Sequence, residues 1–480
     1  MSAITNDGSD IINKTISVDS IYNNSLSIEN FEIQETSKWI NDNNFKKVGL
    51  QFPDELLKIA IPISLELKKT VNCQFGIMAD TSYGSCCIDE VGGEHFSVDA
   101  IVHYGNACLS LTHRKVPSKF VFGKYMVNET EVETSVEIIK FHLNSVFKNE
   151  ILKKCITVVY DFPYIHFCKS VEDKLKNVDF IVFNSFPNLS EYNYNLSVDE
   201  YKLFGSRLVQ SNDNNDNENI ILFIGDRYNY STKTILLSMY HLYKTILLYS
   251  PKTKEIRDVS NEIQKFLRSR LYSIEVAKSA IRVGLLVGTL SIENYLEIYN
   301  YLYDTMRKSG KIVYPMVVGK INANKLANFA DLDALVVINC ADSCLQFSEK
   351  KDDYFKPVVT PYEMICACDS RKFSNPYSSR YFTDFNDLLK EENLVSSFRN
   401  PNESELSLIS GKLINCSINE CRDAIGGELV ARLDSDWSVS AIDKSSRSWF
   451  GLDPKLGQTP VAILKDGRSG IAAGYENEIN

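Results

Sequence analysis

The clearest pattern along the chain is a set of short apolar runs, each bounded by polar residues. Three of these runs share one form, in which Asp is the second residue and Val the last, and they lie at 98–102, 178–182 and 332–336. A continuous apolar run is typical of a parallel strand that is covered on both faces of its sheet. The three runs therefore predict equivalent buried strands in an internal repeat.

Other segments extend this pattern into an alternation of strands and helices. Further buried strands are predicted at 47–52, 156–160, 220–224 and 283–287. Helical periodicity is convincing at 54–70, 261–280 and 291–309, the last of which has Ser291 as its N-cap and Gly310 after its end. Such an alternation predicts the α/β class with mainly parallel sheets.

A length of 480 residues exceeds one ordinary core and favours about three domains. We expect a disordered N-terminal segment, three similar α/β domains and a C-terminal extension. The expected boundaries are 1–26, 27–145, 146–270, 271–391 and 392–480. An Asn- and Asp-rich stretch at 211–219 predicts an exposed loop insertion in the middle domain.

Composition and charge narrow the classes of function. Hydrophobic residues make up 44% and charged residues 24% of the chain, which is typical of a globular protein. A formal net charge of −10 argues against nucleic acid as the main ligand. No apolar run reaches the 18 residues of a membrane span, and no signal peptide is evident. Twelve cysteines in such a chain indicate a reducing compartment, so we expect a cytoplasmic protein with metal or redox chemistry.

Cysteines follow the predicted repeat strands. Cys86 and Cys87 lie in a Gly- and Ser-rich loop after a short apolar strand, whereas Cys108 and Cys340 follow the strands at 98–102 and 332–336. Ligands of α/β sheets gather at such strand ends. The loops could therefore converge although no local CxxC is present. Thiolate clusters favour zinc or iron–sulfur centres, and three thiolates would suit a 4Fe-4S cluster with one open iron. Structural zinc takes four closed ligands.

A plainer interpretation applies to every cysteine, because a free cysteine is usually a small buried hydrophobe. On residue chemistry alone, Cys87, Cys108 and Cys340 are as compatible with core filling as with a ligand role. Core filling is the expectation for Cys73, Cys155 and Cys168, and it is favoured less strongly for the pairs Cys366 and Cys368, and Cys416 and Cys421. We expect His103 to be a hydrogen-bonded core residue, and Asp89 and Glu90 to be capping or solvated groups.

Two motifs carry a resemblance to a known family. Residues 80–90 read Asp-Thr-Ser-Tyr-Gly-Ser-Cys-Cys-Ile-Asp-Glu, and residues 103–110 read His-Tyr-Gly-Asn-Ala-Cys-Leu-Ser. This pairing resembles the diphthamide-synthesis family, the 2-(3-amino-3-carboxypropyl)histidine synthases. Further similar segments lie at 51–54, 288–290 and 354–363, so the resemblance spans roughly 41–368. The tail from 450 to 472 resembles the subunit 2 branch, the diphthamide biosynthesis protein 2 family.

The resemblance implies three similar domains arranged around a central 4Fe-4S cluster. It also implies a reaction that moves the 3-amino-3-carboxypropyl group of S-adenosylmethionine onto a histidine of elongation factor 2, the first step of diphthamide biosynthesis. The cluster in this family breaks the bond to the aminocarboxypropyl carbon, so the absent radical motif CxxxCxxC is not expected. Carried over by position, the ligands would be Cys87, Cys108 and Cys340. Cys86 is the adjacent alternative to Cys87, and Cys344 is a reserve candidate.

One departure from the family pattern concerns the middle domain. Catalytic relatives carry a Gly-Cys step where this chain has Gly205-Ser206. The resemblance therefore implies an auxiliary subunit without catalytic residues, whose cluster helps to reduce the cluster of a homologous subunit 1. The implied partners are subunit 1 in a heterodimer, a small electron-donor protein and elongation factor 2. S-adenosylmethionine would bind at the level of the complex.

Two other interpretations stay open. One is a scaffold subunit of the same complex that binds zinc or no metal. The other is a transferase that acts alone, with loops at Gly84, Gly105 and Gly288 that cradle the nucleoside of S-adenosylmethionine. Glycine at a strand end more often serves a tight turn than ligand contact.

Overall fold

The computed structural model describes most of the chain between residues 27 and 390 and short pieces beyond it. The described ranges are 27–78, 84–112, 116–125, 127–147, 156–175, 201–204, 207–210, 220–226, 230–243, 245–319, 321–349, 354, 356–369, 381–390, 405–406, 411, 413–414, 470–471 and 474–475. Several predictions fall outside these residues, namely those for 1–26, 178–182, 205–206, 211–219, Cys155, Cys416 and Cys421. The chain forms two compact units, residues 1–418 and 419–480.

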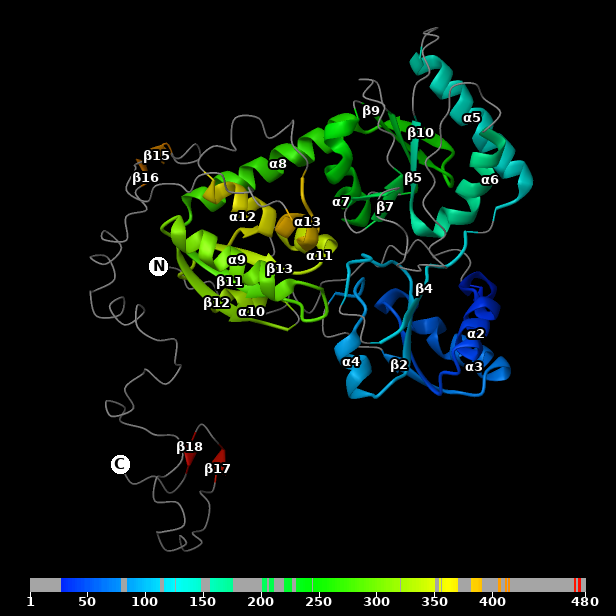
Figure 1. The fold of residues 1–480 in the computed structure, drawn as a ribbon, viewed down its shortest axis with the longest axis horizontal. Coiled ribbons are helices and arrows are strands. Elements are labelled where there is room, and N and C mark those ends of the chain that lie inside the picture. The colour runs from blue at the N-terminus through cyan, green and yellow to red at the C-terminus, as the bar shows by residue number, and fades with distance from the viewer. Residues whose placement is uncertain are drawn as a thin grey trace, which may run out of the picture. The chain divides into compact units, whose positions relative to one another are not determined.

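The first sheet has the strand order β2-β1-β3-β4 and is parallel throughout. Its strands are β1 (Lys47–Gln51), β2 (Gln74–Met78), β3 (Ala100–Tyr104) and β4 (Ser118–Val121). One face is covered by α2 (Ile33–Asp42) and α3 (Leu57–Thr70), whose apolar side chains pack on β1 and β3 (Figure 1). The other described elements here are η1 (Ile28–Phe31), η2 (Asp54–Leu56) and α4 (Glu90–His95).

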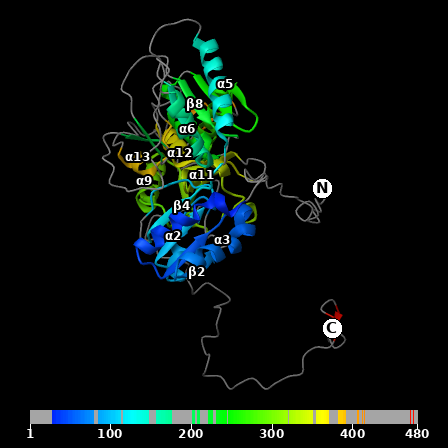
Figure 2. The same cartoon turned by 90° about the vertical axis from the view of Figure 1, so that its right-hand side faces the viewer.

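The middle sheet has the order β10-β9-β8-β5, with β10 as its antiparallel edge. Its strands are β5 (Ile156–Tyr160), β8 (Ile220–Ile224), β9 (Thr245–Ser250) and β10 (Glu255–Asp258). Both views show α5 (Glu129–Phe147) beside α6 (Ile165–Leu175), and both helices pack into the core of this sheet (Figure 1 and Figure 2). The remaining elements are η3 (Phe162–Tyr164), the hairpin β6 (Tyr201–Phe204) and β7 (Arg207–Gln210), α7 (Tyr230–Met239), η5 (Tyr240–Leu242) and α8 (Ser260–Ser279).

The third sheet has the order β12-β11-β13-β14 and is parallel throughout. Its strands are β11 (Arg282–Val287), β12 (Ile312–Val317), β13 (Ala334–Ile338) and β14 (Val358–Val359). Helices α9 (Tyr295–Lys308) and α12 (Pro361–Cys368) pack with α8 on one face, and α10 (Ala323–Ala327) and α11 (Ala341–Glu349) pack on the other. Helix α13 (Phe385–Lys390) follows, and two hairpins lie beyond it, β15 (Glu405–Leu406) with β16 (Leu413–Ile414), and β17 (Gly470–Ile471) with β18 (Gly474–Tyr475).

The predicted α/β class with three mainly parallel sheets is confirmed. The repeat runs at 98–102 and 332–336 become β3 and β13, which take the same place in sheets of identical strand order. The strands predicted at 47–52, 156–160, 220–224 and 283–287 are β1, β5, β8 and β11. The proposed domain boundaries stay a prediction.

The predicted start of the helix at 291–309 is wrong. Helix α9 begins at Tyr295, and its N-cap is Asn294 rather than Ser291. Ile292 pairs with Thr112 in an isolated β-bridge, and the Glu293 N–H donates to the Leu111 carbonyl. These contacts hold residues 291–293 in a loop, and Asn294 has a left-handed conformation, so the helix starts only at Tyr295. No helix in the described ranges is long and apolar enough to cross a membrane.

Candidate metal centre

The functional side chains of this site lie at or just after the carboxyl ends of β1, β3 and β13. In the first sheet, Gln51 pairs with His103 in register, so their side chains emerge next to each other at the strand ends. Cys108 lies four residues after β3, and Cys340 lies two residues after β13. The loop with Cys86 and Cys87 precedes α4. The expectation that these loops meet at strand ends is confirmed by the sulfur positions.

Four cysteine sulfurs form a compact group. The Sγ atoms of Cys86 and Cys340 are 3.6 Å apart, those of Cys87 and Cys108 are 3.7 Å apart, and those of Cys86 and Cys87 are 4.0 Å apart. All four sulfurs lie within 4.8 Å of one another. Cys87, Cys108 and Cys340 are buried, whereas Cys86 is half-buried. The structure thus brings the three predicted residues together and adds Cys86 to them.

Backbone contacts fix the turn that carries Cys86 and Cys87. The Cys87 N–H donates to the Gly84 carbonyl at 3.1 Å, and the Cys108 N–H donates to the Cys86 carbonyl at 3.0 Å. Gly84 allows the loop to pass close to α11, because a Cβ at this position would lie 2.7 Å from Ser343 Oγ. A side chain at residue 84 would therefore push the turn away from the third domain.

Two buried side chains hold the same turn from the first sheet. Gln51 Nε2 donates to the Cys87 carbonyl at 2.7 Å, and Gln51 Oε1 accepts from the Asp89 N–H at 3.0 Å. His103 Nε2 lies 3.1 Å from the Ser85 carbonyl and must donate to it, since a carbonyl only accepts. Burial lowers the pKa of His103, which favours this neutral tautomer. His103 is thus the hydrogen-bonded core residue that was expected.

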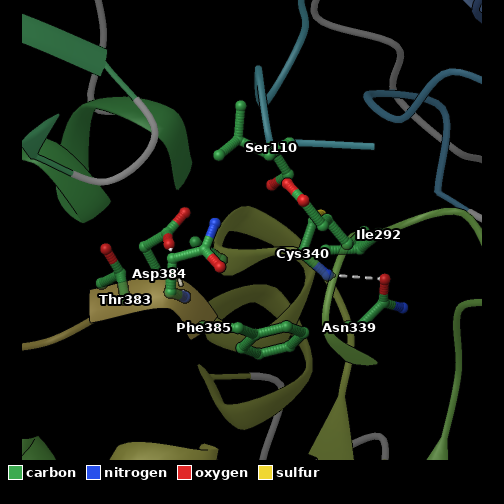
Figure 3. A pocket seen from close by; sticks show the side chains of 11 residues that line it. Ser110, Ile292, Asn339, Cys340, Thr383, Asp384 and Phe385 are labelled. Carbon is green, nitrogen blue, oxygen red and sulfur yellow. Dashed lines mark hydrogen bonds between the residues drawn. The ribbon is translucent and has the colours of Figure 1, made fainter. Parts of the chain in front are cut away.

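The start of α11 holds Cys340. The Cys340 N–H donates to Asn339 Oδ1 at 2.8 Å (Figure 3). The N–H of Ser343 points at the sulfur of Cys340 at 3.4 Å, and the hydroxyl of Ser343 lies 3.1 Å from it. The first N–H groups of a helix lack partners within the helix, and the helix dipole favours negative charge there. The start of the helix therefore favours negative charge near Cys340, whereas hydrogen bonding to Cys108 raises the pKa of the Cys340 thiol.

Electrostatics couple the four sulfur atoms. The pKa of Cys108 is held well below its usual value, because Cys340, Cys86 and Cys87 donate hydrogen bonds to its sulfur. The pKa values of Cys86 and Cys87 are raised well above the usual thiol range, first by that same hydrogen bonding to Cys108. Four thiols this close together, three of them buried, cannot all ionise without a compensating cation. A bound metal would supply that charge and release protons as it binds.

Other residues named from the sequence lie apart from this group. The Cys344 thiol donates to the carbonyls of Val337 and Asn339 at 3.1 and 3.3 Å, so the reserve candidate points elsewhere. Asp89 is the expected cap, because its carboxylate accepts from the Gly92 N–H at 2.8 Å at the start of α4. Glu90 is buried rather than solvated and accepts a 2.7 Å hydrogen bond from the Thr112 hydroxyl. The remaining described cysteines contribute to the protein cores, namely Cys73, Cys168, Cys366 and Cys368.

The donor set fits a thiophilic metal centre. Soft thiolates favour zinc or iron–sulfur clusters. With metal–sulfur bonds of about 2.3 Å, one tetrahedral ion keeps its four sulfurs roughly 3.8 Å apart. Three of the six sulfur separations, at 3.6 to 4.0 Å, match that spacing, and all six lie within 4.8 Å. A 4Fe-4S cluster binds each thiolate through a different iron, so it requires the same sulfurs to move further apart.

A small pocket opens beside Cys340 (Figure 3). The space open to the centre of a water-sized sphere is about 10 Å³, which is room for roughly one water molecule. The residues that line it come from both cysteine-bearing domains and are Ser110, Leu111, Ile292, Glu293, Asn339, Cys340, Ala341, Thr383, Asp384, Phe385 and Asn386. Pockets for drug-sized ligands are roughly 300–1,000 Å³, so this pocket does not hold a nucleoside-bearing substrate in this structure.

The glycines proposed to cradle a nucleoside contact protein atoms instead. A Cβ at Gly288 would lie 2.6 Å from Ile321 Cδ1, and the Gly84 position faces Ser343. Gly105 has a φ of +86°, which is a turn conformation that disfavours side chains. These glycines serve close packing and a turn.

The sequence prediction missed two features of the site. Cys86 was only an alternative to Cys87, although the adjacency of the two cysteines was a usable signal. The hydrogen bonds of Gln51 had no local signal, since they join residues 36 and 38 positions apart in the sequence.

Together, these features define a three-sheet α/β protein with a buried four-cysteine centre. Residues 52–378 match the family model described as putative diphthamide synthesis protein. The relatives named 2-(3-amino-3-carboxypropyl)histidine synthase subunit 2 include one from Danio rerio that is 35% identical, with 94% of this chain and 92% of the relative covered. The one from Schizosaccharomyces pombe is 31% identical, with 94% and 91% covered. The chain therefore belongs to the diphthamide synthesis family, in the subunit 2 branch of the 2-(3-amino-3-carboxypropyl)histidine synthases.

Solved structures agree on the fold. The crystal structure of Dph2 from Pyrococcus horikoshii with a 4Fe-4S cluster has a TM-score of 0.53 and 21% identity, and the match covers 74% of this chain and 93% of that one. A second crystal structure of the same protein has a TM-score of 0.54 and 20% identity, with 74% and 94% covered. At this level of identity, the likeness shows the fold alone.

Proposed function

We propose that this chain is an auxiliary iron–sulfur subunit of the enzyme that transfers a 3-amino-3-carboxypropyl group from S-adenosylmethionine to a histidine of elongation factor 2. This transfer is the first step of diphthamide biosynthesis. The single observation that carries the proposal is the convergence of four sulfurs from three separate loops in a member of the subunit 2 family. The 4Fe-4S cluster of the Pyrococcus horikoshii protein, which shares the fold, adds support for the cofactor.

Cys87, Cys108 and Cys340 are the proposed ligands of the 4Fe-4S cluster. A bound cluster would supply a one-electron reductant. The described residues of this chain hold and shield that centre, since Gln51 and His103 fix the Cys86–Cys87 turn and Ser343 contacts Cys340. The neighbouring pocket has room for roughly one water molecule, which supports electron transfer rather than substrate chemistry at this centre.

The partners in this proposal are the homologous subunit 1, a small electron-donor protein and elongation factor 2. The name subunit 2 in the relatives implies a complex with another subunit. In this scheme the cluster of this chain reduces the cluster of subunit 1, where the new bond forms. Turnover by this chain without subunit 1 would contradict the auxiliary role.

Anaerobic co-purification with subunit 1 tests the proposal. We expect iron and sulfide in this chain, and loss of that iron together with slower transfer in the Cys108→Ala variant. Cys168→Ala is a matched control, because Cys168 is equally buried but belongs to the core of the middle sheet. A native chain without iron, combined with full activity of the Cys108→Ala complex, would refute the cluster role.

A zinc-binding scaffold subunit is the second candidate, and the sulfur spacing favours it. Three of the six sulfur separations are 3.6 to 4.0 Å and all lie within 4.8 Å, which is close to the spacing around one tetrahedral ion. Elemental analysis of the anaerobic complex separates the two candidates. One zinc per chain without sulfide would support the scaffold, whereas iron and sulfide in equal amounts support the cluster.

A further inference from the structure

Helix α3 presents an exposed apolar pair on its outer face. Ile61 is 64% exposed and Leu65 is 56% exposed, and the two residues lie one turn apart on the helix. Among the large apolar side chains that are exposed in the described part of the chain, no other two lie one turn apart on one helix. Apolar side chains that are exposed singly are ordinary, whereas two neighbours form a small patch that another segment can cover.

Two lysines flank this pair on the same face of the helix. Lys58 and Lys68 are exposed and lie three positions before Ile61 and three positions after Leu65. Spacings of three and four positions place side chains on one face of an α-helix. These four residues, which we call the α3 stripe, therefore combine an apolar middle with a positive charge at each end.

The N-terminal segment of the chain begins close enough to cover the α3 stripe. The short helix η1 packs on α3, because Ile28 and Phe31 contact the core to which α3 contributes. Twenty-six residues precede Ser27, which adjoins η1. An extended chain covers about 3.3 Å per residue, so eight residues span roughly 26 Å, whereas the 14 residues of α3 are about 21 Å long. Residues before 20 can thus reach every part of the stripe.

The sequence of that segment complements the stripe in both charge and polarity. Residues 10–19 read Asp-Ile-Ile-Asn-Lys-Thr-Ile-Ser-Val-Asp, with an aspartate at each end of a stretch that contains four β-branched apolar residues. Residues 1–26 contain three Asp and one Lys, so their formal side-chain charge is −2. Exposed ion pairs contribute little free energy, so apolar contact would supply most of the attraction and the charges would set the placement.

We propose that residues 10–19 pack on the α3 stripe, so that Ile61 and Leu65 are covered by the N-terminal segment of the same chain. Asp10 and Asp19 pair with the lysines at the two ends of the stripe. The proposal concerns the first domain and does not depend on a metal at the cysteine centre. A second copy of the chain and the partner subunit are the competing occupants of the same face.

Site-specific photo-crosslinking of the full chain, alone and with subunit 1, separates these occupants. In the Leu65→p-benzoylphenylalanine variant, mass spectrometry maps the cross-linked residues. A mixture of normal and isotope-labelled chains distinguishes links within one molecule from links between two. We expect a link within one molecule to residues 10–19. Phe141→p-benzoylphenylalanine is the matched control, because Phe141 is 80% exposed on α5 and should give no link to that segment.

Reversal of charge tests how the segment is placed. The double variant Lys58→Glu with Lys68→Glu, made in the Leu65→p-benzoylphenylalanine chain, should lose most of the link to residues 10–19. Addition of Asp10→Lys and Asp19→Lys should restore it, because the charges are then exchanged between the two sides. A yield that is unchanged by the first pair of substitutions would overturn the proposed pairing of charges.

Links from position 65 only to another copy, only to subunit 1 or only to other parts of the chain would overturn the proposal, and so would the absence of any link. The reciprocal variant Ile16→p-benzoylphenylalanine keeps the proposal testable where the Leu65 variant folds poorly. It should link to α3 of the same molecule, and a folded variant that gives no such link would also overturn the proposal.

Discussion

Gln51 and Cys87 are joined by a buried hydrogen bond, in which the amide nitrogen of Gln51 donates to the carbonyl of Cys87 at 2.7 Å. The same amide accepts from the Asp89 N–H through its oxygen, so one side chain holds both ends of the segment 87–89. Gln51 and His103 are register partners on β1 and β3, and His103 holds the Ser85 carbonyl. The ends of two neighbouring strands thereby position the cysteine turn.

Replacement of Gln51 should loosen this turn. Gln51→Met keeps the volume of the side chain but leaves the Cys87 carbonyl and the Asp89 N–H buried without their partner. Each unsatisfied group costs about 1–3 kcal/mol, so we expect a lower free energy of unfolding and faster loss of iron from the anaerobic complex. Denaturant unfolding and a time course of iron release measure both effects. Gln74→Met, at an exposed position on β2, is the control, and equal iron release from the two variants would contradict the positioning role.

Ser343 should tune the reduction potential of the proposed cluster. Its hydroxyl lies 3.1 Å from Cys340 Sγ and can donate to a thiolate there. Hydrogen bonds to the sulfurs stabilise the more negative, reduced state and so raise the potential. Ser343→Ala should therefore lower the midpoint in a redox titration followed by electron paramagnetic resonance. Ser238→Ala removes a buried hydroxyl on α7 and should leave the midpoint unchanged. A midpoint in Ser343→Ala that equals the native value would show that the hydroxyl does not act on the cluster.

The strands and the meeting of the loops were predictable for a simple reason. A buried parallel strand requires a continuous apolar run, so β3 and β13 were visible as repeats, and their equivalence placed Cys108 and Cys340 at corresponding strand ends. The apolar runs and their repetition can be seen directly in the sequence.

Details set by contacts between distant segments were not predictable in this way. Ser291 has the chemistry of an N-cap, yet the bridge between Ile292 and Thr112 delays α9 until Tyr295. In an extended segment, neighbouring side chains point in opposite directions, so Cys86 would be expected to point away from Cys87. The turn closed by the Gly84 carbonyl and the Cys87 N–H instead brings both sulfurs to the same side. In both cases a tertiary contact overrides a local preference.

A buried ion pair between α8 and α12 should contribute strongly to the free energy of unfolding. Arg270 Nη1 lies 3.4 Å from Glu363 Oε1, and both side chains are almost fully buried. Removal of one partner of such a pair costs about 3–5 kcal/mol, because the other charge stays buried. We expect Arg270→Met to lower the free energy of unfolding by that amount in denaturant titrations.

The double variant Arg270→Met with Glu363→Gln is the informative companion. Glu363 also accepts from the Thr360 N–H at 2.9 Å in a capping box, a role that Gln can retain. The double variant should therefore recover much of the lost stability. If the two substitutions simply add, the ion pair does not account for the loss.

Glu32 should make stability depend on pH in the first domain. Burial raises the pKa of Glu32 above its ordinary value of 4.5, although Lys124 and Lys119 oppose that shift. A raised pKa means that the folded state binds the proton more tightly than the unfolded state, so stability falls as pH rises from about 4.5 through the folded pKa. Glu32→Gln removes this penalty. The variant should unfold at a higher temperature than the native chain at pH 7 and at the same temperature near pH 4, which calorimetry at the two pH values can measure. A variant that is less stable than the native chain at pH 7 would instead show that attraction to Lys119 and Lys124 outweighs desolvation.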